Sequence, residues 1–291
     1  MSLAQHFQSD SPVISFELFP PKTEKGFKTL EKNVQQLLEL NPAFFTCTYG
    51  AGGSSQAATL DVVSKVKKMT GLPIASHLTC VGSTVSELVD YLNRAVDVGC
   101  DYIVALRGDP PKGEDSFTAV EGGLRYANEL VDLIKDKFPS LGIIVAGYPE
   151  VHQEAPDAQT DLLNLKRKVD AGADIIVTQL FYDNADYFAF VDQCHDIGIE
   201  IPIVPGILPV TNFAQAERIA KLCKARIPDE LRDPMLQSDA PEHQFEVGVD
   251  HARRQSIELL DRGVPGIHYY VLNKSEAAKA LMEGMSMPAG G

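Results

Sequence analysis

The chain has 291 residues, of which 44% are hydrophobic and 23% charged, the composition of an ordinary globular protein. Its 26 Lys and Arg against 40 Asp and Glu give a net charge of −14, which disfavours a nucleic acid or an anionic membrane as partner. No apolar run approaches the roughly 20 residues that span a bilayer, and residues 1–10 lack the features of a signal peptide. We therefore expect a cytoplasmic protein with a small-molecule substrate.

Short β-branched runs alternate along the chain with longer segments that carry apolar residues at helical spacing. The eight expected strands are 13–19, 43–49, 73–79, 101–107, 142–148, 173–179, 201–206 and 266–272. The expected helices are 26–40, 56–70, 84–98, 123–138, 158–171, 184–197, 212–224, 243–262 and 275–285. Five glycines fall between a helix and a strand, where a left-handed cap favours glycine: Gly71, Gly99, Gly172, Gly198 and Gly263.

These repeats are compatible with a closed barrel or an open doubly wound sheet. Strands that are apolar on both faces, as at 103–106 and 175–177, are typical of a parallel sheet covered by helices. Eight strands favour the barrel, and no GxGxxG motif follows the first strand. We predict an α/β fold, a single (β/α)8 TIM barrel over 1–291 with flexible ends at 1–10 and 286–291. The acidic, proline-bearing segment 228–243 is expected to be a surface excursion.

Active sites of such barrels form at the carboxyl ends of the strands, so the residues that close each strand are the candidates. Every expected strand closes in polar or special-geometry residues. In chain order they are Glu17, Thr48-Tyr49, His77 to Thr79, Arg107-Gly108-Asp109, Tyr148 to His152, Thr178-Gln179, Pro205-Gly206 and Asn273-Lys274. Alone, Glu17 is compatible with a structural ion pair and His77 with a core histidine, but their convergence on one rim indicates a functional site.

Simple metal or nucleophile motifs are missing from the sequence, which contains no HExxH, GxSxG or P-loop and no CxxC pair among its five cysteines. We therefore predict no metal site and reduced thiols, with Cys47, Cys80 and Cys223 in apolar runs that fill the core.

A group of basic residues near the expected rim can hold a phosphorylated cofactor through charge-assisted hydrogen bonds. The group consists of Arg107, His152, Arg167 and Lys168. The cations at 166–168 are consecutive on a helix and cannot share one face, so we expect only one or two of them to reach the site.

Seven segments in order resemble the methylenetetrahydrofolate reductase family, in the short bacterial form that consists of the catalytic barrel alone. They are SFELFPPK (15–22), TCTYGA (46–51), HLTC (77–80), ALRGD (105–109), YPEVH (148–152), DLLNLKRK (161–168) and PGILP (205–209). The resemblance implies a flavoprotein oxidoreductase that binds FAD at the carboxyl ends of the strands, without a Rossmann fingerprint. It would take hydride from NADH or NADPH and, in ping-pong order, reduce 5,10-methylenetetrahydrofolate to 5-methyltetrahydrofolate, a methyl source for methionine synthesis.

The same resemblance implies two catalytic carboxyl groups. Glu17 would be the general acid that protonates a ring nitrogen of the substrate, so that the five-membered ring opens to an iminium ion. Asp109 would lie between flavin and pterin and accept hydrogen bonds from the pterin. The chemistry requires Glu17 to be protonated at neutral pH, and a buried position at the rim is expected to raise its pKa accordingly.

Binding residues are implied in the same way. Substrate contacts are implied for Asp109, Gln179, Gln215 and Lys274, and nicotinamide contacts for Thr48 and Gln179. The residues implied around FAD are Thr48, Tyr49, Ala51, His77, Arg107, Gly108, Asp109, Ala127, Tyr148, His152, Ala155, Asp161, Asn164, Arg167 and Lys168. Lys274 stands where the family leads us to expect an arginine, so a point charge replaces a bidentate grip. Ile219 stands where some members place an aromatic that stacks on nicotinamide, which leaves the choice of NADH or NADPH open.

Two other classes of function stay open. One is a flavin-free barrel that binds a reduced folate and transfers its methyl group, which would be colourless. The other is a catalytically silent folate-binding or assembly protein, which would leave a buried carboxyl group such as Glu17 without a role. Reduced folate is the expected substrate, and association of the outer helices into a homo-oligomer is expected for a barrel of this size.

Overall fold

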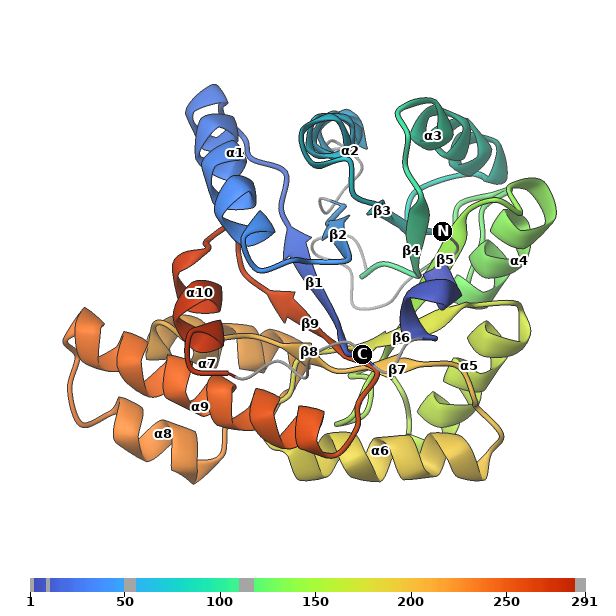
Figure 1. The fold of residues 1–291 in the computed structure, drawn as a ribbon. Coiled ribbons are helices and arrows are strands. Elements are labelled where there is room, and N and C mark those ends of the chain that lie inside the picture. The colour runs from blue at the N-terminus through green and yellow to red at the C-terminus, as the bar shows by residue number, and fades with distance from the viewer. Residues whose placement is uncertain (1–2, 9–10, 50–55, 110–117, 286–291) are drawn as a thin grey trace.

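Parallel strands form a ring with the helices arranged around its outside, as Figure 1 shows. The computed structural model describes residues 3–8, 11–49, 56–109 and 118–285. The strands are β1 (Val13–Leu18), β2 (Phe44–Cys47), β3 (Ile74–Thr79), β4 (Tyr102–Leu106), β5 (Gly142–Gly147), β6 (Ile175–Thr178), β7 (Ile203–Val204), β8 (Gly206–Ile207) and β9 (Gly266–Tyr270). The helices are the 3-10 helix η1 (Leu3–Phe7), α1 (Glu24–Leu38), α2 (Gln56–Thr70), α3 (Val85–Asp97), α4 (Ala127–Lys137), α5 (Ala158–Asp170), α6 (Asn184–Asp196), α7 (Phe213–Cys223), α8 (Asp229–Met235), α9 (Pro241–Asp261) and α10 (Glu276–Met282).

The seventh expected strand closes the ring in two pieces. The sheet order is β7-β6-β5-β4-β3-β2-β1-β9-β8, with every pair parallel, so β7 pairs with β6 while β8 pairs with β9. Pro205 separates the two pieces because proline has no backbone N–H, and its carbonyl accepts a hydrogen bond of 2.9 Å from the His268 N–H. At Gly206 a Cβ atom would lie 2.3 Å from the Thr178 carbonyl oxygen, so only glycine fits this seam. The predicted (β/α)8 barrel is confirmed, with a split strand at its closure.

The strands pack on both faces, as their two-sided apolar sequences predicted. One apolar cluster fills the inside of the ring, and its buried members are Leu3, Val13, Phe44, Ala75, Tyr102, Val104, Ile144, Ile175, Val177 and Val204. The larger cluster lies between the strands and the helices and includes Phe16 and Leu18 of β1. Because side chains alternate along a strand, Ser15 and Glu17 share the inner face with Val13. The inside of the barrel is therefore apolar near η1 and polar toward the carboxyl ends of the strands.

The segment 228–243 is not the surface excursion that its prolines and acidic residues suggested. It forms α8 and the first turn of α9, and these two helices pack on each other. Leu231 and Met235, one helical turn apart, are fully buried in a cluster that also contains Leu208 and Phe213. Asp229 and Glu230 lie in the first turn of α8 and Glu242 in the first turn of α9, where the helix dipole stabilises negative charge. Pro241 starts α9, a position that tolerates proline.

The glycine caps, the cysteines and the amino-terminal segment agree with the predictions in part. All five glycines predicted as caps have a positive φ. Cys47 and Cys80 are free and buried in the core as predicted, whereas Cys223 is only partly buried. Leu3–Phe7, inside the segment expected to be flexible, form η1, and Leu3 is buried. In the described part of the chain, no helix has the length and apolarity needed to cross a membrane.

Candidate active site

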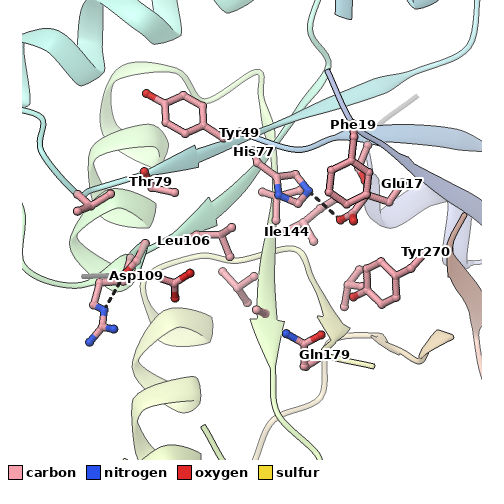
Figure 2. A pocket seen from close by; sticks show the side chains of 18 of the residues that line it. Glu17, Phe19, Tyr49, His77, Thr79, Leu106, Asp109, Ile144, Gln179 and Tyr270 are labelled. Carbon is pink, nitrogen blue, oxygen red and sulfur yellow. Dashed lines mark hydrogen bonds and ion pairs between the residues drawn. The ribbon is translucent and has the colours of Figure 1, made fainter. Parts of the chain in front are cut away.

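A cavity of about 1410 Å³ opens at the carboxyl ends of the strands, where barrels of this type hold their active sites. Figure 2 shows side chains from opposite sides of the barrel that face it. Nine residues implied as catalytic or binding groups line the cavity: Glu17, Tyr49, His77, Arg107, Gly108, Asp109, Tyr148, His152 and Gln179. The expected convergence of the strand ends on one site is therefore found for these nine residues.

Glu17 lies in the cavity on the inner face of β1, with only 7% of its surface exposed. Its Oε2 atom is 3.4 Å from Nε2 of His77 on β3 (Figure 2). Burial raises the pKa of Glu17 to about 8 and lowers the pKa of His77 to about 4. The two groups have the geometry of an ion pair, but burial penalises both charges, so they meet as neutral groups at pH 7 and Glu17 holds the proton. The predicted rise in the pKa of Glu17 is confirmed.

A polar layer that the sequence reasoning missed lies beside Glu17. The Ser15 hydroxyl and Nδ1 of His268 are 2.8 Å apart, and Nε2 of His268 is 3.5 Å from Oγ1 of Thr46. Burial lowers the pKa of His268 to about 3, and proximity to His77 adds to the effect, so this ring is neutral as well. On the same strand, the Tyr270 hydroxyl donates to the Thr178 carbonyl oxygen at 2.7 Å. The alternation of inward-facing positions along β9 was the signal that could have identified His268 and Tyr270.

Arg107, Gly108 and Asp109 follow β4 and form one wall of the cavity. Gly108 has a φ of +90°, and a Cβ atom there would lie 2.6 Å from Val81, so the turn requires glycine. Nε of Arg107 donates to the Gly108 carbonyl oxygen at 3.2 Å, and its Nη2 pairs with the Glu154 carboxylate. This hydrogen bond lowers the pKa of Glu154. Sequence reasoning missed Glu154, which lies 47 residues from Arg107 in the chain.

Side chains of helix α5 form hydrogen bonds with the backbone of β5 and of the loop that follows it. Nζ of Lys168 donates to the Ala146 carbonyl oxygen at 2.5 Å, and burial lowers the pKa of Lys168 to about 8. Asp161 accepts a hydrogen bond of 2.8 Å from the His152 N–H, and Arg167 donates to Oδ1 of Asn164 at 2.8 Å. Lys166 pairs instead with Asp170 on its own helix. Only part of the 166–168 run therefore turns toward the barrel, as its helical spacing predicted.

The remaining implied site residues do not line the cavity. Those within the described residues are Thr48, Ala127, Ala155, Asp161, Asn164, Arg167, Lys168, Gln215 and Lys274. Thr48 follows β2, Ala127 begins α4, Gln215 lies in the first turn of α7, and Lys274 is exposed. Ala51 lies outside the described residues. One wall of the cavity is apolar, and the residues that form it are Leu180, Leu208, Ile219, Cys223 and Leu272.

The chemistry of the cavity fits a large, partly apolar ligand that carries anionic groups. It combines the apolar wall with the guanidinium group of Arg107. Oγ1 of Thr79 is buried, lies on a cavity-lining residue and has no hydrogen-bond partner in the protein, as expected for a group that binds a ligand. No three His, Cys, Asp or Glu side chains of the described residues are grouped so that they could hold a metal ion. A flavin dinucleotide is compatible with this donor set.

Comparison with known proteins links this chain to one family. Residues 2–286 match the methylenetetrahydrofolate reductase family. The chain is 39% identical over 288 residues to methylenetetrahydrofolate reductase (NADH) 1 of Arabidopsis thaliana, which covers 94% of this chain and 48% of that protein. It is 41% identical over 280 residues to 5,10-methylenetetrahydrofolate reductase of Salmonella typhimurium, covering 95% of this chain and 92% of that protein. The chain thus spans about half the length of the plant relatives.

Two solved structures share the fold at low sequence identity. One is an uncharacterized protein from Clostridium thermocellum that binds two copies of 5-methyl-5,6,7,8-tetrahydrofolic acid, with a TM-score of 0.66, 17% identity, and coverage of 96% of this chain and 95% of that chain. The other is dihydropteroate synthase from Xanthomonas albilineans, with a TM-score of 0.52, 14% identity, and coverage of 94% and 92%. At these identities the likeness supports the barrel fold.

Proposed function

Because the chain belongs to the methylenetetrahydrofolate reductase family, we propose that it reduces 5,10-methylenetetrahydrofolate to 5-methyltetrahydrofolate with FAD as cofactor and NADH or NADPH as electron donor. The observation that carries the proposal is Glu17, a carboxyl group that stays protonated at neutral pH inside a large cavity. A ping-pong order, with the nicotinamide and the folate using the same cavity in turn, completes the proposal, and the product serves as a methyl source for methionine synthesis.

The residues around the cavity are suited to hold FAD. Arg107 supplies a cation at the rim, and Lys168 and Arg167 of α5 add positive charge behind the loop of Tyr148 and His152. Such cations form charge-assisted hydrogen bonds with phosphate oxygens. Thr79 supplies a buried hydroxyl that has no protein partner. In this position a bound FAD would supply the hydride chemistry, by taking a hydride from the nicotinamide and passing it to the one-carbon unit of the folate.

Glu17 supplies the proton that the folate needs. Protonation of a ring nitrogen opens the five-membered ring and produces an iminium ion, which is the electrophile that hydride reduces. A carboxyl group with a pKa near neutrality both holds this proton and releases it, which is the condition for efficient general acid catalysis. Because the ring of His77 beside Glu17 is neutral, it adds no positive charge there, and the main charge next to Glu17 is the one that develops on the substrate as its ring opens.

Asp109 and Gln179 are proposed to orient the substrate. Asp109 is an exposed carboxylate at the mouth of the cavity, where it can accept hydrogen bonds from the amino and ring N–H groups of a pterin. Oε1 of Gln179 accepts a hydrogen bond of 2.9 Å from the Leu180 N–H, which orients the amide so that its Nε2 group is the donor for a ligand. We propose that Thr48 and Gln179 contact the nicotinamide and that Gln215 and Lys274 contact the folate.

The apolar wall bears on how the nicotinamide ring is held, and the names of relatives bear on the choice of electron donor. Ile219 lies in this wall, so a nicotinamide ring would pack against an aliphatic side chain rather than stack on an aromatic one. The names of the plant relatives specify NADH, and we propose NADH as the better donor for this chain.

The visible absorbance spectrum of the purified protein, before and after anaerobic addition of NADH, tests the proposal. We expect the bands of oxidised flavin, their loss on addition of NADH, and their return when 5,10-methylenetetrahydrofolate is added. A protein that stays colourless when supplied with FAD would contradict the proposal and support the flavin-free folate barrel. A flavin that NADH reduces but the folate does not reoxidise would contradict the proposed substrate.

A further inference from the structure

We propose that Asn273 is a positioning residue that holds the end of β1, and with it Glu17, in place against the end of β9. The inference rests on the proposed function, because Glu17 is the group whose position matters. Asn273 does not line the cavity itself, so it acts through its neighbours. Three observations carry the inference: the backbone conformation after β9, a two-way hydrogen bond to Phe19, and an anchor on α1.

The chain makes an unusual turn directly after β9. Leu272 has a φ of +49° and Asn273 a φ of +58°, two consecutive left-handed residues of which neither is glycine. Asparagine adopts this conformation readily, but leucine does so at a cost in steric strain. Such strain persists only where surrounding contacts enforce it, and it is often found at functional sites. Leu272 lines the cavity, so the strained position places an apolar side chain in the site.

The Asn273 side chain pairs with the backbone of Phe19 in both directions. The Phe19 N–H donates to Oδ1 of Asn273 at 2.8 Å, and Nδ2 of Asn273 donates to the Phe19 carbonyl oxygen at 2.8 Å. The regular pairing of β1 with β9 reaches Glu17 opposite Tyr270. The side-chain amide continues this pairing beyond the point where the backbone ladder stops. Two segments separated by 254 residues are thereby joined two residues beyond Glu17.

The turn is also fixed to the outer layer of helices. Nδ2 of Asn33 on α1 donates to the Asn273 carbonyl oxygen at 2.8 Å, and the Ser275 hydroxyl donates to Oδ1 of Asn33 at 2.9 Å. Asn33 and Ser275 are both buried. Because these hydrogen bonds to α1 fix the turn, the side-chain amide of Asn273 has a fixed position when it pairs with the Phe19 backbone.

These contacts determine the shape of one end of the cavity. Glu17, Phe19 and Leu272 all line it, and Figure 2 shows Phe19 and Glu17 at the same end, near Tyr270. Loss of the amide would free the Phe19 backbone while leaving the rest of β1 paired. A general acid that shifts by about 1 Å from its productive position is expected to lose up to about 100-fold in rate.

The variant Asn273→Gly separates positioning from backbone tolerance, because glycine accepts the left-handed conformation but has no side-chain amide. We expect reduction of 5,10-methylenetetrahydrofolate to slow by about 10- to 100-fold. Oxidation of NADH with a quinone acceptor, which does not need the proton of Glu17, should stay within about twofold of the wild-type rate. A matched control is Asn184→Ala, since Asn184 is also buried and hydrogen-bonded, to the Gln255 carbonyl oxygen at 3.1 Å, but does not line the cavity.

Wild-type rates of Asn273→Gly in both half-reactions would overturn the inference, and so would the same fold loss in both. Either result makes Asn273 only a turn residue. If Asn273→Gly does not fold, Asn273→Asp decides the question, since a carboxylate still accepts from the Phe19 N–H but cannot donate to its carbonyl. The same selective loss in the folate half-reaction is expected for that variant. A wild-type protein that binds flavin but does not reduce the folate would contradict the proposed function, whereas normal wild-type activity with an unaffected variant contradicts only the role of Asn273.

Discussion

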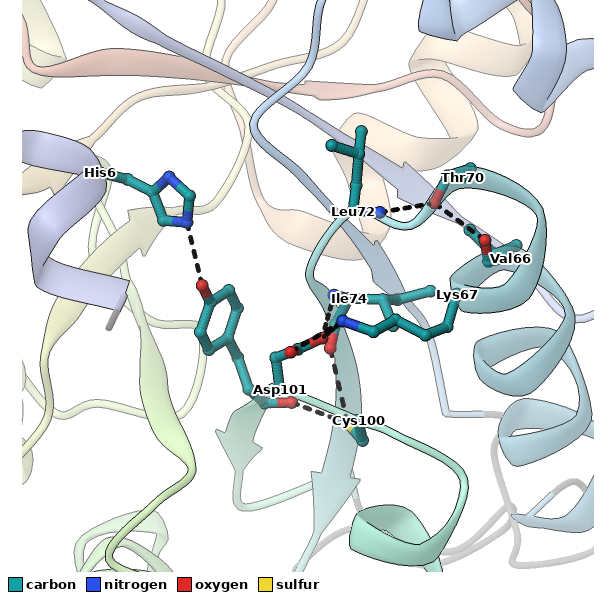
Figure 3. A network of polar contacts seen from close by, with 9 residues as sticks. His6, Val66, Lys67, Thr70, Leu72, Ile74, Cys100 and Asp101 are labelled. Carbon is teal, nitrogen blue, oxygen red and sulfur yellow. Dashed lines mark hydrogen bonds and ion pairs between the residues drawn. The ribbon is translucent and has the colours of Figure 1, made fainter. Parts of the chain in front are cut away.

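The two ends of the barrel both contain buried or partly buried polar groups, but those groups face different surroundings. At the amino end, Figure 3 shows the Asp101 carboxylate, which accepts from Nζ of Lys67 at 2.9 and 2.8 Å and from the Ile74 N–H at 2.9 Å. Nε2 of His6 lies 2.9 Å from the Tyr102 hydroxyl, which joins η1 to β4. At the carboxyl end, Glu17 and Thr79 face a cavity instead.

Along the same strands, the polar groups at the amino end contribute to stability and those at the carboxyl end to function. Polar groups that are satisfied within the protein lock the elements together, as Asp101 does for α2 and β3. Polar groups that are buried against a cavity retain unmet hydrogen-bonding capacity or a displaced pKa, as Thr79 and Glu17 do. Strand β4 carries Tyr102 near one end and is followed by Arg107 at the other. Variants at the two ends should therefore change different measurable properties.

Glu17→Gln is expected to have the largest effect, because it keeps the shape of the side chain and removes the transferable proton. We expect folate reduction to fall by about 10² to 10⁴-fold. NADH oxidation with a quinone acceptor should continue at the wild-type rate, since that half-reaction needs no proton from Glu17. Stopped-flow measurement of each half-reaction checks the prediction. Normal rates in both would contradict the assignment of Glu17 as the acid.

Leu3→Ala tests the opposite end of the barrel. Leu3 is 1% exposed and belongs to the cluster that fills the inside of the ring. Removing its buried methyl groups should lower the free energy of unfolding by about 2 to 4 kcal/mol. Because the cavity lies at the other end, both half-reactions should keep their wild-type rates at temperatures where the variant is folded. Urea denaturation and the two half-reactions measure these effects, and a selective loss of folate reduction would contradict the separation of the two ends.

The pH dependence of stability gives a third test. The pKa of Glu17 is about 8 in the folded protein and near 4.5 when unfolded, so between these two pH values the native state binds a proton that the unfolded state has lost. Stability then falls as pH rises, by roughly 2 kcal/mol between pH 6.5 and 8. His77 and Tyr270, which face Glu17 from β3 and β9, stay neutral in this window because burial lowers the pKa of His77 to about 4 and raises that of Tyr270 well above its usual range.

The measurement is the difference in unfolding free energy between wild type and Glu17→Gln at pH 6.5, 7.3 and 8, since other titrating groups are common to both proteins. The unfolding free energy of the variant should increase relative to that of the wild type as pH rises. Below pH 6.5 the buried histidines give stability the opposite dependence on pH. Burial lowers the pKa of His268 to about 3, so on acidification the unfolded state takes up a proton before the native state does, and stability falls. A constant difference across the three pH values would show that Glu17 is ionised in the native state.

Most of the architecture was predictable because it depends on local patterns. Periods of two and of 3.6 residues, together with glycines after helices, indicate βα units and hence a parallel barrel. The helix α8 was missed because Pro234 and its acidic residues outweighed the single apolar pair Leu231 and Met235. The split at Pro205 was missed because it depends on which strands meet at the closure, which no local pattern encodes.

The site was predictable only in part. The strand ends identified Glu17, His77 and Asp109, since the fold itself brings the carboxyl ends of parallel strands together. Contacts between distant residues were not predictable, because any carboxylate in the sequence could have paired with Arg107. The contact of Arg107 with Glu154 and the two-way bond of Asn273 with Phe19 are of this kind. His268 was missed because it lies two positions before the end of β9, inside the strand rather than after it.

Glu154 provides the smallest expected effect and a test of how the open end of the barrel receives its cofactor. Its carboxylate pairs with the cavity-lining guanidinium of Arg107, so it competes with, and repels, the phosphate groups of an incoming dinucleotide. Glu154→Gln should therefore tighten binding of FAD to the apoprotein by about 3- to 10-fold, an effect that weakens as salt is added. Riboflavin, which has no phosphate, should bind both proteins alike, and Glu246→Gln on the exposed face of α9 controls for the change in net charge. Flavin fluorescence titrations measure the affinities of all three proteins for FAD and for riboflavin. Weaker binding of FAD by the variant would mean that Glu154 holds Arg107 ready for the cofactor instead of competing with it, and the open end of the barrel would then be organised before the cofactor arrives.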